Sequence, residues 1–371
     1  MVPDLNNYFY KYYITYDKLY ELTYHAFYGK TDADKANVFI DMNGLTRSLF
    51  ETNTLFSFKD TQTPIASAFI NLVAHLRSYY LSRHNSYLRF YIIWGENRPE
   101  SARSIFSDYN AHYLQAFDSN TALRKILYQN IELMELICPY IPDVYFINVG
   151  QEEVGSGIAA LFENTDISNL FSSCPNIIYT SDPFLYQLIL YPNTFVFRPK
   201  KRIMDNGQRK DNSWVVNKSN LYDGYRLDMR YSKSSPDILD YRFYKDVIGI
   251  CGIRNRHIRG KLTYNSAIKL IEKIVSHYNI DPNYPFDLLC NIIDEENIVG
   301  NGKIVKRGTG YNFSDCIPIY NALNISQYQY PRAYSIRPAI LKGVVDLTNA
   351  NDIREINDKY FINYPLDLMG L

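Results

Sequence analysis

Between residues 37 and 200, short apolar runs alternate with segments of helical periodicity. The runs 37–41, 88–94, 144–149 and 176–181 have the length and composition of buried strands. Apolar residues recur at helical spacing in 64–82, 120–138, 152–163 and 183–190. Because parallel strands are joined by helical crossovers, this alternation predicts an α/β fold with a mostly parallel central sheet flanked by helices.

Acidic residues follow four of the predicted strands. They are Asp41, Glu96, the pair Glu152 and Glu153, and Asp182. Ligands of parallel sheets bind beyond the carboxyl ends of the strands. Mg²⁺ and Mn²⁺ take carboxylate oxygens there and activate water for attack on a phosphodiester. Each acid alone is also what a helix cap or a solvated loop contains. The series at successive strand ends favours a site of divalent-metal phosphodiesterase type.

Composition excludes several classes of function. Lys plus Arg and Asp plus Glu are 39 each, so no overall charge draws the chain to nucleic acid or to an anionic membrane. Any contact with nucleic acid must therefore use local basic patches. Five widely spaced cysteines without a CxxC pair are typical of a reduced, cytosolic protein, and no apolar run is long enough for a membrane span. We expect a cytoplasmic protein with no membrane partner.

Tyrosine is unusually frequent, with 35 residues. Tyr, Asn and Ile all have A/T-rich codons, so an A/T-rich genome, such as that of a virus, accounts for the bias. Base stacking explains a few of these rings at most, because most must pack with their hydroxyls hydrogen-bonded.

The order of motifs resembles the 5′-nuclease superfamily, which includes flap endonucleases, phage 5′-to-3′ exonucleases and the N-terminal domain of DNA polymerase I, and which shares a PIN-like core. The similar segments begin with Val38-Phe-Ile-Asp-Met-Asn-Gly-Leu45 and Phe90-Tyr-Ile-Ile-Trp-Gly-Glu-Asn-Arg-Pro99. Gly150-Gln-Glu-Glu-Val-Gly155 stands where the family has Gly-x-Glu-Ala-Asp-Asp. Ile177-Ile-Tyr-Thr-Ser-Asp-Pro-Phe-Leu-Tyr-Gln-Leu188 is similar to the family's Ser-Gly-Asp-x-Asp-x-x-Gln-Leu, and residues 241–271 stand at its helix–three-turn–helix. The resemblance covers about residues 37–275.

The resemblance divides the chain into four parts. We predict an N-terminal extension over 1–36, a PIN-like nuclease core over 37–235, a helix–three-turn–helix-like segment over 236–279 and a C-terminal extension over 280–371. Within them, residues 198–214 are expected to form a hairpin or exposed loop, and 234–237 to begin a helix.

The resemblance also implies roles for individual residues. Asp41, Glu152 and Asp182 would be catalytic and would bind Mg²⁺ or Mn²⁺, with Glu96 and Glu153 as further metal ligands. The predicted contacts to nucleic acid are the cations Arg98, Arg103, Lys200, Lys201, Arg202, Arg254, Arg256, Arg259 and Lys261. Basic runs of this kind are also common in solvated loops.

The chain departs from the family at most of the remaining acids. Residues without a carboxylate stand at the family's other acidic positions, and these are Gly95, Val154, Gly155, Phe184, Ile250 and Ile253. In the arch segment, Asn110 and Tyr113 stand where the family has Lys and Arg. Fewer hard oxygen ligands mean weaker binding of Mg²⁺ and no two-ion clamp on the reacting oxygens.

Three functional hypotheses follow. The first is a viral or phage protein with a degenerate metal site, non-catalytic or impaired, that binds branched or duplex DNA or takes part in replication or virion assembly, in the host cytoplasm or the virion. The second is an active Mg²⁺- or Mn²⁺-dependent 5′-to-3′ exonuclease or flap endonuclease that uses the residual acids. The third is a scaffold for protein partners. The first is the leading hypothesis, because only part of the expected carboxylate set is present.

Overall fold

The computed structural model describes a large part of the chain, and these residues form two compact units. The described ranges are 35–44, 69, 72–73, 76–77, 87–111, 118–119, 121–138, 141, 143–163, 169–199, 201–203, 209–211, 214–229, 239–253, 256–295, 298–299, 303–304 and 312–325. Unit 1 contains the described residues up to 96 and between 117 and 217. Unit 2 contains those between 97 and 116 and between 218 and 329. The four-part division of the sequence stays a prediction.

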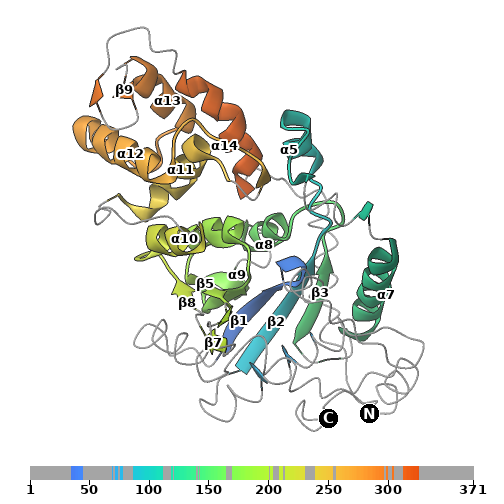
Figure 1. Cartoon of the computed structure of the whole chain (residues 1–371). Coiled ribbons are helices and arrows are strands. Elements are labelled where there is room, and N and C mark those ends of the chain that lie inside the picture. Colours follow the sequence, from blue (N-terminus) through green and yellow to red (C-terminus); the bar gives the residue numbers. More distant parts are fainter. Residues whose placement is uncertain are drawn as a thin grey trace. The chain divides into compact units, whose positions relative to one another are not determined.

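Unit 1 is built on a six-stranded sheet (Figure 1). In spatial order its strands are β3 (Val144–Asn148), β2 (Tyr87–Trp94), β1 (Lys35–Asp41), β4 (Asn176–Tyr179), β5 (Thr194–Arg198) and β8 (Trp214–Val216). The first five are parallel, and β8 pairs with β5 in the antiparallel direction. The predicted fold class, a mostly parallel sheet with flanking helices, is confirmed.

The central strand β1 is apolar on both faces. Val38, Phe39 and Ile40 are at most 3% exposed, as expected for a strand in a parallel sheet that is covered on both sides. Phe39 pairs in register with Tyr91 of β2, and their rings stack at 4.9 Å. Tyr91 stacks in turn on Tyr145 of β3 at 5.0 Å. A row of aromatic rings therefore crosses three strands and uses some of the chain's many tyrosines as core.

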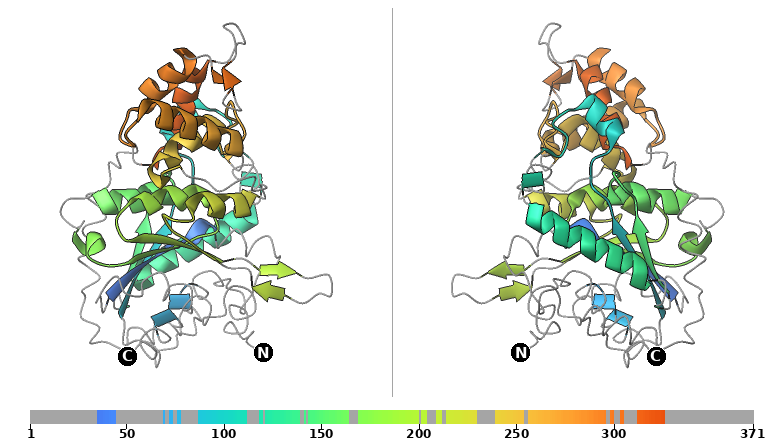
Figure 2. Two further views of the ribbon diagram at one scale, coloured as in Figure 1. Left: turned by 90° about the vertical axis from the view of Figure 1, so that its left-hand side faces the viewer. Right: turned by 90° about the vertical axis from the view of Figure 1, so that its right-hand side faces the viewer.

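Helices cover this sheet (Figure 2). They are α7 (Thr121–Ile137), which packs on β3, α8 (Val154–Glu163), which packs on β2, and the short α9 (Asn169–Ser172). Residues 183–190 form a 3-10 helix, η2 (Pro183–Leu190), where the sequence predicts a helix. Of the helix predicted over 64–82, the described residues include Phe69, Leu72, Val73 and Leu76, all helical and buried.

The basic stretch after β5 contains a hairpin, as the sequence analysis expects. The strands β6 (Lys201–Ile203) and β7 (Arg209–Asp211) pair in the antiparallel direction and project from the sheet in both views of Figure 2. The expected helix start at 234–237 lies outside the described residues.

Unit 2 is mainly helical. Its elements are α5 (Glu100–Ile105), α10 (Leu221–Met229), η3 (Tyr241–Phe243), α11 (Tyr244–Cys251), α12 (Tyr264–Tyr278), α13 (Phe286–Glu295), β9 (Ile298–Val299), β10 (Lys303–Ile304), η5 (Phe313–Cys316) and α14 (Ile317–Leu323). The elements from α13 onward lie in a region where the sequence predicts no structure. The carboxylate of Asp294 joins two of them, because it accepts hydrogen bonds from the backbone N–H groups of Phe313 (2.6 Å) and Ser314 (3.1 Å) at the start of η5. Within the described residues, no helix is long and apolar enough to cross a bilayer.

One acid is buried in the core of unit 2. Asp246 on α11 is 7% exposed, and burial raises its pKa from 3.8 to about 8, although the neighbouring Lys245 acts in the opposite direction. Tyr320 of α14 and Cys290 of α13 also lie close enough to interact with it electrostatically. Because the folded state holds this proton more tightly than the unfolded state, Asp246 lowers the stability progressively as the pH rises from about 4 to about 8.

We therefore expect Asp246→Asn to stabilise the protein at high pH. The free energy of unfolding in urea should exceed that of the wild type by a few kcal/mol at about pH 8.5, and the gain should shrink at about pH 5. Asp287→Asn, on the exposed side of α13, is the matched control and should change little. An equal effect of Asp246→Asn at both pH values would contradict this account.

Candidate functional site at the carboxyl edge of the sheet

The predicted acids of unit 1 lie at one edge of the sheet. Asp41 ends β1, Glu96 follows β2, Glu152 and Glu153 follow β3, and Asp182 follows β4. These four strands are neighbours in the order β3-β2-β1-β4 and are parallel, so their carboxyl ends meet at the same edge. The expected placement of the acids is thus confirmed for all five residues.

A threonine hydroxyl connects the acids of β1 and β4. The Oγ1 of Thr180 donates to Oδ2 of Asp41 (2.6 Å) and accepts from the backbone N–H of Asp182 (2.9 Å). The other oxygen of Asp41 accepts from the N–H of Gly44 (3.0 Å). Asp182 caps η2, because its Oδ1 accepts from the N–H of Phe184 (3.0 Å). Both carboxylates are therefore bonded to donors of the protein itself.

Beside them, an amide and a glycine connect the ends of β1 and β2. The side chain of Asn43 donates to the carbonyl of Gly95 and accepts from its N–H (3.3 Å). A Cβ atom at Gly95 would lie 2.2 Å from the carbonyl oxygen of Glu152 and 2.6 Å from Cγ2 of Val149. The turn after β3 thus packs on the Gly95 backbone, and the position has no room for the aspartate of the family.

The remaining acids of this edge have separate surroundings. The Glu96 carboxylate accepts a hydrogen bond from the Tyr128 hydroxyl of α7 (2.9 Å). Glu152 is half-buried, and Glu153 is 1% exposed directly before α8, where the positive end of the helix dipole favours an acid. In the part of the chain that the structure describes, no three His, Cys, Asp or Glu side chains are grouped so that they could hold a metal ion. The structure brings Asp41 and Asp182 together through Thr180 but does not complete the predicted triad with Glu152.

Apolar side chains occupy four of the positions at which the family has further acids. Val154 and Phe184 of unit 1 are at most 2% exposed, and Ile250 and Ile253 of unit 2 are fully buried. A return to aspartate at any of them would place a carboxylate in an apolar core. At this edge of unit 1, Val154 and Phe184 therefore supply no carboxylate to the pair of divalent ions that the resemblance implies.

The arch segment of the resemblance lies in unit 2. Asn110, which stands where the family has a lysine, is 2% exposed and has a left-handed backbone (φ 58°), a conformation that asparagine tolerates. Its side chain donates to the carbonyl of Asn97 (3.2 Å), and its N–H donates to the carbonyl of Arg256 (3.2 Å). Asn110 therefore connects the backbone at Asn97 with the backbone at Arg256 by hydrogen bonds, and its side chain carries no positive charge.

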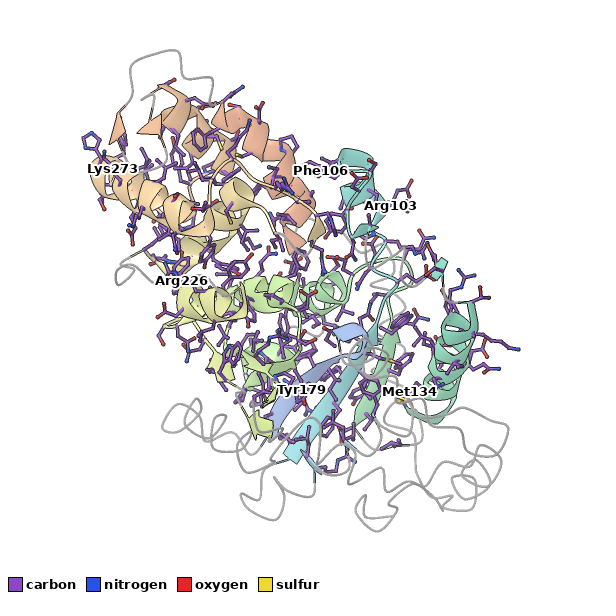
Figure 3. The ribbon with its side chains drawn as sticks, viewed as in Figure 1. Arg103, Phe106, Met134, Tyr179, Arg226 and Lys273 are labelled. Atoms are coloured by element: carbon purple, nitrogen blue, oxygen red, sulfur yellow. The ribbon has the colours of Figure 1, made fainter. Side chains whose placement is uncertain are left out.

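The predicted nucleic-acid contacts differ in their exposure. Arg103 and Arg259 are exposed (Arg103 in Figure 3), and Arg98 is half-buried. Lys261 forms an ion pair with Asp315 (2.7 Å), and this hydrogen bond raises its pKa. Arg256 is only 6% exposed because its loop folds back on α11, so this cation is not presented at the surface. The remaining predicted contacts have side chains outside the described residues, and they are Lys200, Lys201, Arg202 and Arg254.

Two glycines close the loop between α11 and α12. Gly252 has a φ of +70°, and a Cβ there would lie 2.4 Å from the carbonyl oxygen of Ile258. A Cβ at Gly260 would lie 2.1 Å from the carbonyl oxygen of Ile250, which also accepts from the N–H of Lys261 (2.9 Å). Both glycines lie in the 241–271 segment of the resemblance. The close approach of other backbone atoms to these two glycines becomes visible only in the structure.

Comparison with known proteins gives the class of the fold. No family model and no curated protein sequence matches the chain. Among solved structures, the 5′-exonuclease of bacteriophage T5 with bound zinc aligns with a TM-score of 0.50 at 14% identity, over 87% of this chain and 99% of that chain. The T5 D15 protein co-crystallised with metal ions aligns with a TM-score of 0.49 at 13% identity, over 86% and 99% of the two chains. The chain therefore shares the fold of this T5 5′-exonuclease, which is the fold that the resemblance implies.

The close packing of Gly95 generates a prediction. Gly95→Ala should lower the free energy of unfolding by about 2 kcal/mol or more, because the added methyl group meets the backbone of the turn at 149–152. Urea denaturation of the full chain measures this loss. Glu96→Gln, one residue further on and outside the tight contact, is the control. If Gly95→Ala were as stable as the wild type, the turn would have to yield easily, and an aspartate could be restored there.

Proposed function

We propose that this protein is a DNA-binding component, of viral or phage type, that has a 5′-nuclease fold and does not hydrolyse phosphodiesters with divalent metal ions. The observation that carries the proposal is the state of the carboxyl edge. The Asp41 carboxylate accepts hydrogen bonds from Thr180 and from the N–H of Gly44. The Asp182 carboxylate accepts from the N–H of Phe184, and the backbone N–H of Asp182 donates to Thr180. The positions of the missing acids are a closely packed glycine and buried apolar residues.

The chemistry of phosphodiester cleavage makes this difference decisive. In the two-metal mechanism, several carboxylates hold two ions a few Å apart, so that one ion activates water and the other stabilises the leaving oxygen. Mg²⁺ gives up its water reluctantly and needs near-octahedral oxygen ligands. At this edge the Asp41 and Asp182 carboxylates already accept hydrogen bonds from the protein, and the described acids form no group of three that could hold such an ion.

Binding of DNA requires fewer specific groups than cleavage of DNA does. Phosphate contacts require exposed cations and backbone N–H groups, and these do not depend on a metal site. Arg103 and Arg259 are exposed in unit 2, and the loop around Gly252 and Gly260 keeps a helix–loop–helix arrangement between α11 and α12. The T5 protein with the same fold is a 5′-exonuclease, which supports nucleic acid as the ligand class.

The proposal predicts binding without cleavage. Labelled 5′-flap and nicked duplex DNA should remain intact through a titration with Mg²⁺ or Mn²⁺. The affinity should fall steeply between two salt concentrations, because each neutralised phosphate adds to the salt dependence. Gel analysis of the products and fluorescence anisotropy measure the two effects on the same samples.

The double variant Asp41→Ala/Asp182→Ala is the control for contaminating nucleases. Metal-dependent cleavage by the wild type that disappears in this variant would refute the proposal and establish an active nuclease with a reduced site. Absence of both cleavage and salt-sensitive binding would refute DNA binding and favour a scaffold for protein partners.

A further inference from the structure

The outer face of α12 carries a row of basic side chains. Lys269, Lys273 and His277 are exposed and stand four residues apart, so they follow one another along the helix at intervals of about 6 Å. Figure 3 shows Lys273 on the outer side of this helix. The opposite face is buried in unit 2 through Ala267, Ile268, Leu270, Ile271 and Ile274.

Two acids close to this row in the sequence accept hydrogen bonds from the protein. The carboxylate of Glu272, on the same helix, accepts a hydrogen bond from the backbone N–H of Leu239 (3.1 Å) and is half-buried. Asp281, in the turn after α12, accepts from both the backbone N–H and the side-chain amide of Asn283 (2.8 Å each). Between Lys269 and His277, the residues of α12 that are exposed are basic or neutral.

Two exposed tyrosines follow the row in the sequence. Tyr278 is 40% exposed, and its ring meets that of His277 edge-on at 4.7 Å. Tyr284, in the turn that leads into α13, is 36% exposed. Among the tyrosines whose side chains are described, these two alone are exposed, whereas the others pack in the cores of the two units or lie half-buried.

Nucleic acid with unpaired bases matches this combination. A row of cations follows the phosphates of a strand, and exposed rings stack on bases that are not already stacked in a duplex. Basic groups alone would serve duplex and single strand alike, so the tyrosines decide between them. We propose that this surface, the α12 face (Lys269, Lys273, His277, Tyr278 and Tyr284), binds a single-stranded segment of nucleic acid. This inference rests on the proposed function, and it specifies that unit 2 contacts single-stranded rather than duplex nucleic acid.

Fluorescence anisotropy with the full chain tests the proposal. The probes are a labelled single-stranded oligothymidine and a labelled duplex of the same length, each titrated at several salt concentrations. Lys269→Gln/Lys273→Gln should reduce the slope of log affinity against log salt for the single strand by about 1.4, since each phosphate contact contributes about 0.7. Lys125→Gln, an exposed lysine on α7 of unit 1, is the control and should leave the slope unchanged.

The tyrosines should act differently from the lysines. Tyr278→Ala/Tyr284→Ala should weaken single-strand binding about tenfold for each ring, with the salt slope and the duplex affinity unchanged. Tyr278→Phe/Tyr284→Phe should retain the single-strand affinity, because the ring face is kept. The substituted side chains are exposed, so thermal unfolding should match that of the wild type in all variants.

The outcomes distinguish a failure of this inference from a failure of the proposed function. If the wild type binds nucleic acid and the α12 variants bind equally well, the inference is overturned and the proposed function stands. If the tyrosine pair lowers duplex and single-strand affinity alike, the α12 face is not selective for single strands and the inference is overturned as well. If the wild type binds neither probe at low salt, the proposed function itself fails.

Discussion

The position of β1 between two parallel strands is the constraint on which unit 1 depends. Hydrogen bonds to β2 on one side and β4 on the other fix its register, and helices cover both faces, so the strand has to be apolar from Val38 to Ile40. The same register delivers Asp41 to the middle of the carboxyl edge, between the segments that follow β2 and β4. A slip of one residue would exchange the two faces of the strand and move Asp41 away from Thr180.

Within this frame, the proposed loss of metal-dependent cleavage rests on local packing at the carboxyl edge. Asp41 and Asp182 remain at the edge, where Thr180 and the N–H of Gly44 donate to the Asp41 carboxylate and the N–H of Phe184 donates to one oxygen of Asp182. The turn after β3 closes on Gly95, where a side chain has no room. Hydrogen bonds at this edge thus connect the ends of β1 and β2 through Asn43 and the ends of β1 and β4 through Thr180. The exposed cations and tyrosines of unit 2 lie on other elements, so the proposed binding of nucleic acid does not depend on the carboxylates of this edge.

Much of this fold could be predicted from local sequence. Apolar runs predict the strands β1, β2 and β4, and helical periodicity predicts α7. Pro183 indicates the start of η2. The acids at the strand ends follow from the same alternation. What could not be predicted depends on contacts between distant segments. These include the burial of Arg256, the capping of η5 by Asp294 and the close approach of Gly95 to the 149–152 turn. Thr180 stands directly before Ser181 and Asp182, a signal that could have identified it as a partner of the acids.

Direct measurement of metal binding tests the central claim that the carboxyl edge no longer holds divalent ions. Electron paramagnetic resonance of Mn²⁺ distinguishes free from bound ion and requires neither substrate nor activity. The account predicts that the signal of free Mn²⁺ in the presence of the protein equals that in buffer up to about millimolar concentrations, because the described acids form no group of three that could hold the ion. Saturable binding at micromolar Mn²⁺ that Asp41→Asn/Asp182→Asn abolishes would contradict it.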